Sequence, residues 1–229
     1  MIFWTEFALA WLVFLLSHFL PSLGLRDRLI AAMGRRSYFA IYGILSVLCV
    51  VWLISAAARA PFVELWPPEP WTRWVPLLTM PFAVFLATCA IGGRYPFSLG
   101  GHRAGAFDPA SPGLARLSRH PLPLALALWS GAHLFPNGDL AHVLLLGSFA
   151  ALGLGAIPMF DHRARAALPP ADVEAMFQVA PIISASAMFD RHWLSASARS
   201  LFLRVVWSML VLVLILALHE TVIGVPLLP

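Results

Sequence analysis

Five histidines of the 229-residue chain lie in or at the ends of long apolar runs, where an ionisable side chain is costly unless it has a function. They are His18, His120, His133, His142 and His219. Neutral imidazoles from two different helices can hold the iron of a b-type haem, while an apolar helix bundle shields the macrocycle. The remaining histidines, His102, His162 and His192, are predicted to be solvated in loops.

The depth of each histidine along its helix favours one pair. Measured along the helix axis, His18 lies roughly 12 Å from Arg26, which follows the first apolar run. His133 lies roughly 21 Å from Arg119, which precedes the fourth run. Helical side chains lean toward the N-terminus of their helix, so imidazoles on helices of opposite direction converge. His120 and His142 lean away from that level, whereas His219 lies deep enough to compete. We therefore expect haem ligation by His18 and His133, with His18 and His219 as the second pair.

The same residues have plainer interpretations. A histidine in a membrane helix can hydrogen-bond a neighbouring helix with no cofactor present. The Arg119-His120 pair, at the start of an apolar run, could contact a haem propionate or a lipid phosphate, or serve only as flanking charge. Asp139, in an Asn-Gly-Asp turn, can cap the helix that follows. Asp161, with the histidine and two arginines that follow it, is predicted to form a solvated boundary that contains at most one ion pair.

Other catalytic patterns are lacking in the sequence. It has no Ser–His–Asp order, phosphate loop, HExxH or CxxC motif, so hydrolase and nucleotide-driven functions have no support. Its only cysteines, Cys49 and Cys89, fall inside apolar runs and are predicted to fill space in a helix bundle.

The composition requires a membrane. Hydrophobic residues make up 60% of the chain and charged residues 11%, whereas soluble domains carry about 25% charged residues. All 15 basic residues are arginines in short clusters between apolar runs, which indicates membrane topology rather than nucleic-acid binding.

The apolar runs predict an all-α, polytopic membrane bundle of about six transmembrane helices that forms a single domain over residues 1–229. The runs cover about 3–25, 38–58, 75–91, 121–136, the stretch from the 137–139 turn to about 160, and 201–222. Residues 59–74 are predicted to be an interfacial loop rich in Trp and Pro. Residues 161–200 are mixed, with a short helix after Pro170 and a semi-apolar piece, 179–189, too short to span.

The arginine distribution predicts the orientation. The first, third and fifth loops hold four arginines each, and we expect them on the cytoplasmic side of a bacterial plasma membrane, with both termini outside. These residues are Arg26, Arg28, Arg35 and Arg36; Arg94, Arg103, Arg116 and Arg119; and Arg163, Arg165, Arg191 and Arg199.

Two motifs resemble a known family. The segment Arg119-His120-Pro121, followed by Trp129, Ala132-His133 and Asn137-Gly138-Asp139, is similar to the signature of the NnrU family. Leu16-Ser17-His18 and Gly34-Arg35 also resemble that family. The similarity runs from about residue 6 to 165, with a looser fit beyond.

The resemblance carries expectations about function. The family includes bacterial proteins encoded with denitrification genes, and haem-b-containing 15-cis-ζ-carotene isomerases of plants and cyanobacteria. The proposed haem histidines of the isomerases correspond to His18 and His133. A cysteine proposed for ligand switching in the plant enzymes is replaced here by Ser130. We therefore expect a haem-binding accessory protein of nitrite and nitric oxide reduction that handles nitric oxide. The alternatives are a carotenoid isomerase acting on a hydrophobic polyene, or a cofactor-free assembly factor for a reductase.

Overall fold

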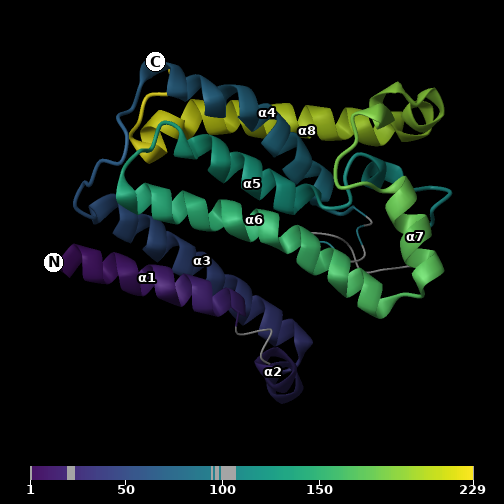
Figure 1. Cartoon of the computed structure of the whole chain (residues 1–229), viewed down its shortest axis with the longest axis horizontal. Coiled ribbons are helices and arrows are strands. Elements are labelled where there is room, and N and C mark those ends of the chain that lie inside the picture. The colour runs from purple at the N-terminus through teal and green to yellow at the C-terminus, as the bar shows by residue number, and fades with distance from the viewer. Residues whose placement is uncertain (1, 20–23, 94, 96–97, 99–106, 229) are drawn as a thin grey trace. The chain divides into compact units, whose positions relative to one another are not determined.

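A computed structural model describes residues 2–19, 24–93, 95, 98 and 107–228, and it is all-helical there, as the sequence predicts (Figure 1). Eight α-helices occur in these ranges: α1 Ile2–Phe19, α2 Leu25–Met33, α3 Arg35–Arg59, α4 Trp74–Ala90, α5 Pro121–Leu134, α6 Leu140–Ala167, α7 Pro170–Val179 and α8 Arg191–Ile223. Short 3-10 helices cover Pro70–Arg73, Gly113–Arg116 and Ser186–Phe189. The predicted loop residues Arg94, His102 and Arg103 lie outside the described residues.

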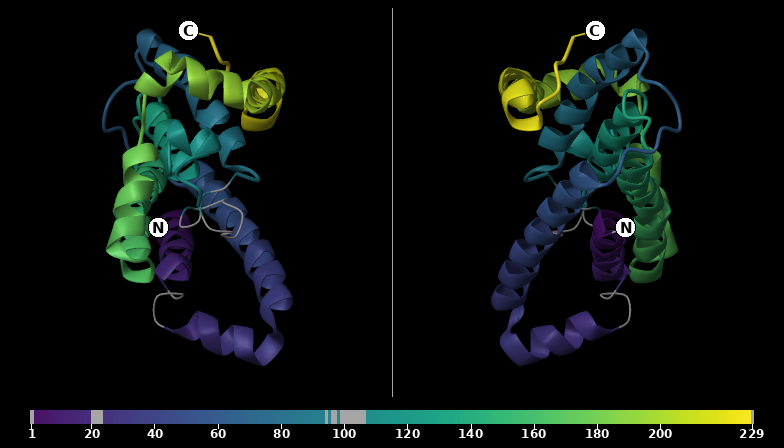
Figure 2. Two further views of the ribbon diagram at one scale, coloured as in Figure 1. Left: turned by 90° about the vertical axis from the view of Figure 1, so that its right-hand side faces the viewer. Right: turned by 90° about the vertical axis from the view of Figure 1, so that its left-hand side faces the viewer.

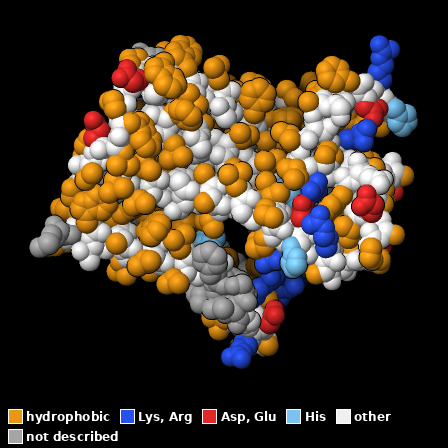
Figure 3. Space-filling view, viewed as in Figure 1, with side chains coloured by type: hydrophobic (Ala, Val, Ile, Leu, Met, Phe, Trp, Pro, Cys, Tyr) orange, Lys and Arg blue, Asp and Glu red, His pale blue; other side chains and the backbone are white. Residues whose placement is uncertain are grey.

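Four of the described helices are long and apolar enough to cross a membrane. They are α3, α4 with its preceding 3-10 turn, α6 and α8; α1 is apolar but shorter, and α5 has 14 residues. Hydrophobic side chains cover most of the face drawn in Figure 3, and many of the arginines gather near α2 and α7. The chain is therefore a helical membrane protein, and six crossings, which require α1 and α5 to span as well, stay a prediction.

The contacts divide the chain into two compact units. One unit comprises Met1–Pro67 and Asn137–Leu145, and the other comprises Pro68–Pro136 and Leu146–Pro229. Each unit is described by itself below.

In the first unit, α1 packs against α3. Phe7, Phe14 and Leu53 are buried between apolar neighbours. Glu6 accepts a hydrogen bond from Trp52 Nε1 at 3.3 Å and pairs with Arg59, so its charge is compensated within the helix pair.

The first predicted loop contains a helix, α2. Gly24 precedes it at φ 75° and Gly34 follows it at φ 82°. Both values favour glycine, and they separate α2 from its neighbours. The sharp turn from α2 into α3 is visible in both views of Figure 2. Hydropathy alone did not indicate α2, because arginines occupy three of the positions between 25 and 35.

The Asn137-Gly138-Asp139 turn also belongs to the first unit. Leu65 N donates to Gly138 O at 2.7 Å, and a methyl carbon at position 138 would lie 2.0 Å from the carbonyl oxygen of Trp66. Only glycine fits so close to this backbone. Asp139 Oδ1 accepts a hydrogen bond from His142 N at 3.2 Å, so the predicted cap of α6 is confirmed.

In the second unit, α4 packs against α5 and α8. Arg204 of α8 donates to Thr88 O near the end of α4 at 2.6 Å, where unsatisfied carbonyls favour a cation. Gly153 of α6 faces α5: a methyl carbon there would lie 2.7 Å from Pro123 O. These contacts hold α4, α5, α6 and α8 together around the site described below.

Two boundaries differ from the sequence prediction. Helix α6 continues past residue 160 to Ala167, and α8 begins at Arg191 rather than near 201. Hydropathy marks only the apolar part of a helix, and helices extend into polar sequence when propensity and capping allow it. Asp190 supplies such a cap for α8, since its Oδ1 accepts from Trp193 N at 3.0 Å. The helix predicted after Pro170 is confirmed as α7.

Residues 179–189 do not form a span. Ser184 N donates to Leu117 O and Arg119 N donates to Pro181 O, both at 2.9 Å. This segment therefore lies alongside residues 117–119 and helps to fix the approach to α5.

Candidate functional site

A buried polar cluster forms where residues 117–120 lead into α5. Pro121 occupies the first helical turn, where its missing N–H costs nothing. The preceding residue, His120, has φ −129° and ψ 56°, and its N–H donates to Ser118 Oγ at 3.1 Å. This non-helical conformation directs the imidazole of His120 into the second unit, where it is only 3% exposed.

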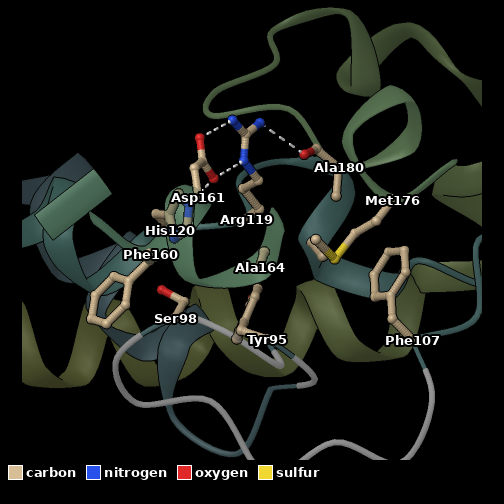
Figure 4. Close-up of a pocket in the computed structure, with 11 residues that line it drawn as sticks. Tyr95, Ser98, Phe107, Arg119, His120, Phe160, Asp161, Ala164, Met176 and Ala180 are labelled. Atoms are coloured by element: carbon tan, nitrogen blue, oxygen red, sulfur yellow. Dashed lines mark hydrogen bonds and ion pairs between the residues drawn. The ribbon is translucent and has the colours of Figure 1, made fainter. Parts of the chain in front are cut away.

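Asp161 of α6 pairs with Arg119 at two points. Arg119 Nε donates to Oδ1 at 2.9 Å and Nη2 donates to Oδ2 at 2.6 Å. The remaining terminal nitrogen, Nη1, donates to Ala180 O at 3.1 Å. The two side chains are 13% and 9% exposed, so the pair is largely withdrawn from water (Figure 4). A planar guanidinium matched to a carboxylate in this way fixes orientation as well as charge.

His120 shares the same carboxylate. Its Nε2 lies 2.8 Å from Asp161 Oδ1, and its ring stacks on Phe160 with the centroids 6.0 Å apart. Burial lowers the pKa of His120, against the opposing effect of the Asp161 carboxylate. A neutral His120 that donates from Nε2 carries its lone pair on Nδ1.

A small cavity faces this lone pair. Within the described part of the chain, His120 Nδ1 and Ser98 Oγ are buried and have no hydrogen-bond partner. Both residues line a cavity of about 20 Å³, a volume that accommodates about one water molecule. The site can therefore present an oriented proton acceptor to a molecule of that size.

Helix α7 covers the outer side of the cluster. The guanidinium of Arg119 lies 4.3 Å from the centroid of the Phe177 ring, and that of Arg165 lies 4.9 Å from it. Two cations on one aromatic ring hold α7 against the end of α6.

The histidines predicted to ligate haem lie elsewhere. His18, in the first unit, is exposed, and its Nδ1 lies 2.8 Å from Phe14 O, one turn back along α1. His133, in the second unit, is partly buried, and its Nδ1 lies 2.7 Å from Trp129 O, one turn back along α5. Each imidazole also packs against the aromatic ring of the residue whose carbonyl it contacts.

The other membrane histidines have distinct surroundings. His219 Nδ1 lies 3.0 Å from Val225 O beyond the end of α8. His142 Nδ1 lies 2.7 Å from Asp139 Oδ2 in the first turn of α6. The described residues contain no group of three or more His, Cys, Asp or Glu side chains arranged to hold a metal ion.

Comparison with known proteins identifies the family. The family model described as NnrU protein matches residues 6–227, almost the whole chain. The chain belongs to the NnrU family. No curated protein and no solved structure matches it.

One feature of this NnrU protein differs from the sequence prediction. Arg119 and His120 do lie together, but Asp161, predicted to be solvated, is their shared partner and is buried. The signal for it was the helix-forming stretch of Ala and Arg after Asp161, which extends the apolar helix by two turns and turns the carboxylate inward. The contact of Arg119 and His120 with a propionate or a lipid phosphate stays a prediction.

Proposed function

We propose that this NnrU protein binds haem b through His18 and His133 and is an accessory protein of nitrite and nitric oxide reduction. Family membership supports this role, since the motif residues of the NnrU signature are present in both histidine segments. In this proposal the chain lies in a bacterial plasma membrane with both termini outside, and the arginine distribution supports that orientation.

One observation carries the haem proposal: both histidines use Nδ1 in the same way. Each places Nδ1 within hydrogen-bond distance of the carbonyl four residues earlier in its own helix. A neutral imidazole that donates from Nδ1 keeps its lone pair on Nε2, the nitrogen that would reach an iron ion. A backbone carbonyl on the second nitrogen is the usual way in which a protein orients a ligating histidine and raises its basicity.

The residues around the two imidazoles suit such a role. Phe14 packs on His18 with the centroids 4.4 Å apart, and Trp129 packs on His133 at 5.7 Å, so both rings are restrained by aromatic neighbours. These contacts limit the rotation of both imidazole rings. A haem held by two imidazoles, one of which can be released, supplies an iron site for nitric oxide or for an alkene.

A carotenoid cis–trans isomerase is the alternative enzyme. The position of the switching cysteine of the plant isomerases is Ser130, which is fully buried and donates from Oγ to Leu126 O at 2.6 Å. A hydroxyl that donates its hydrogen bond within its own helix is a poor substitute for a thiolate as an iron ligand. This difference favours the accessory role over isomerase chemistry of the plant type. A cofactor-free assembly factor for a reductase is the third candidate.

The test is the absorbance spectrum of protein purified from haem-replete cells. We expect a Soret band with bis-imidazole features, which His18→Ala and His133→Ala each abolish or shift. His120→Ala is the matched control, since this histidine is committed to Asp161. A colourless, folded preparation that does not respond to added haem would refute both haem proposals and leave the assembly factor.

Two further measurements separate the remaining candidates. His219→Ala tests the competing histidine: loss of the Soret band in this variant, with retention in His133→Ala, would transfer the ligand role to His219. Incubation of the haem-loaded protein with a 15-cis carotene, followed by product analysis, tests the isomerase alternative. We expect no conversion, together with a spectral change on addition of nitric oxide to the reduced protein.

A further inference from the structure

The first unit contains a groove between α1, α2 and α3. Its volume is about 560 Å³, within the range of roughly 300–1,000 Å³ typical of ligand pockets. Val13 of α1, Leu29 of α2, and Leu45 and Leu48 of α3 contribute to an almost entirely apolar wall. Arg26 of α2 also lines the groove and gives it a cationic end.

The groove has the length of a lipid chain. Its α3 wall runs from Tyr38 to Trp52, which corresponds to about 21 Å along the helix axis. One leaflet of the hydrocarbon layer is roughly 15 Å deep, so an acyl chain of that leaflet can lie along the whole groove. Leu45 and Leu48 are 58% and 59% exposed, so the wall remains open to such a chain.

Two arginines converge at the cationic end. The guanidinium carbon of Arg26 lies 5.5 Å from the centroid of the Phe39 ring, and that of Arg35 lies 5.2 Å from the same centroid. Arg26 Nε is buried without a hydrogen-bond partner among the described residues. No described carboxylate lies within ion-pair distance of either guanidinium. Two cations and a buried donor are therefore gathered around one ring, and a protein carboxylate does not neutralise them.

We propose that this groove binds an anionic phospholipid, with one acyl chain between α1 and α3 and the phosphate beside Arg26 and Arg35. A phosphate accepts several charge-assisted hydrogen bonds from guanidinium groups and would satisfy the orphaned Nε. Arg28 and Arg36 lie in the same short stretch, and Asp27 is its only acid, so the local charge favours an anionic headgroup. In the orientation proposed above, this end of the groove faces the cytoplasmic leaflet, where anionic lipids attract arginine clusters. The proposal does not depend on haem.

The test measures lipid retention by native mass spectrometry of the full chain. The protein is reconstituted into nanodiscs of equal parts phosphatidylglycerol and phosphatidylcholine and then released in mild detergent. We expect phosphatidylglycerol to remain preferentially bound. Arg26→Gln should lower its retention about tenfold, the effect of losing one charge-assisted hydrogen bond to the phosphate. Arg36→Gln is the matched control: it removes the same charge from the same cluster but does not line the groove, and retention should change less than twofold.

A second pair of variants tests the acyl-chain site. Leu45→Trp places a large side chain in the groove and should abolish retention of both lipids. Ile44→Trp, at an adjacent exposed position outside the lining, should leave retention unchanged. Equal losses in Arg26→Gln and Arg36→Gln would refute the site and leave general surface attraction. Equal retention of the two lipids, displacement by inorganic phosphate alone, or displacement by haem would also overturn the proposal.

Discussion

Arg119 and Asp161 form a two-point ion pair that joins the start of α5 to the last two turns of α6. Arg119 Nε lies 2.9 Å from Oδ1, and Nη2 lies 2.6 Å from Oδ2. Forming a buried pair of this kind yields little net stability, because both charges lose hydration. Its effect is positional, since the same carboxylate oxygen also holds the Nε2 atom of His120. The pair thereby fixes the imidazole whose other nitrogen faces the small cavity.

Removing the carboxylate charge should destabilise the protein strongly. Asp161→Asn leaves the guanidinium of Arg119 buried without a counter-ion, which costs roughly 3 kcal/mol in comparable buried pairs. The temperature of unfolding in detergent should fall clearly. It can be measured from the change in fluorescence as buried tryptophan side chains become exposed. Asp172→Asn changes the same residue type on the exposed face of α7 and should alter stability by less than about 0.5 kcal/mol. Equal effects of the two substitutions would contradict a buried, mutually dependent pair.

The sequence predicted most of the apolar framework and little of this cluster. Pro121 at the start of α5, the cap at Asp139 and the short helix after Pro170 were all predicted, because each depends on local backbone chemistry. The pairing of Arg119 with Asp161 joins residues 42 positions apart, and no local rule specifies it. Hydropathy placed Asp161 outside the helix, so its inward direction was missed.

The polar ends of α6 and α8 were missed for a related reason. An apolar run ends where the hydrocarbon layer ends, but the helix ends only where its last carbonyls find other partners or its backbone turns. The haem ligands were predicted on a different basis, namely the depth of each histidine along its helix and the resemblance to the NnrU family. The shared Nδ1 contact of His18 and His133 adds support that sequence alone did not contain.

The stability of the second unit should depend on pH through His120. Burial lowers the pKa of this imidazole in the folded protein below its ordinary value near 6.5, so the unfolded chain binds the proton first as pH falls. The contribution of neutral His120 is therefore present above about pH 6.5 and is lost below it. We expect the unfolding temperature of the unchanged protein to fall as the pH is lowered from 7.5 to 5.5. The fall should be smaller in the His120→Gln variant.

The control for this pH effect is His162→Gln, at an exposed position of the same helix as Asp161. This variant should retain the full pH dependence, because it leaves His120 and its contact with Asp161 unchanged. If His120→Gln and the unchanged protein lost the same stability between the two pH values, His120 would not be the group responsible.

Close packing of α5 on α6 should make Gly153 irreplaceable. A methyl carbon at this position would lie 2.7 Å from Pro123 O and 2.9 Å from Ala127 N, and backbone atoms cannot move aside without separating the helices. Gly153→Ala should therefore destabilise the protein by roughly 1–3 kcal/mol. Gly147→Ala, in the same helix with nothing within 4 Å of the added carbon, should be neutral or slightly stabilising. Thermal unfolding of both variants in one detergent provides the comparison, and tolerance of Gly153→Ala would show that the helices are farther apart.

The number of membrane crossings can be decided by cysteine labelling from one side. In a background of Cys49→Ala and Cys89→Ala, single cysteines replace Arg28, Asn137 and Arg163, and whole cells are treated with an impermeant thiol reagent. If α1 and α5 both span, positions 28 and 163 lie on the cytoplasmic side and only position 137 is labelled. If only the four long helices span, positions 28 and 137 share one side and position 163 lies on the other. Because α5 has 14 residues, roughly 21 Å, its crossing requires local thinning of the bilayer or an extension by residues beyond the helix, and we expect labelling at position 137 alone.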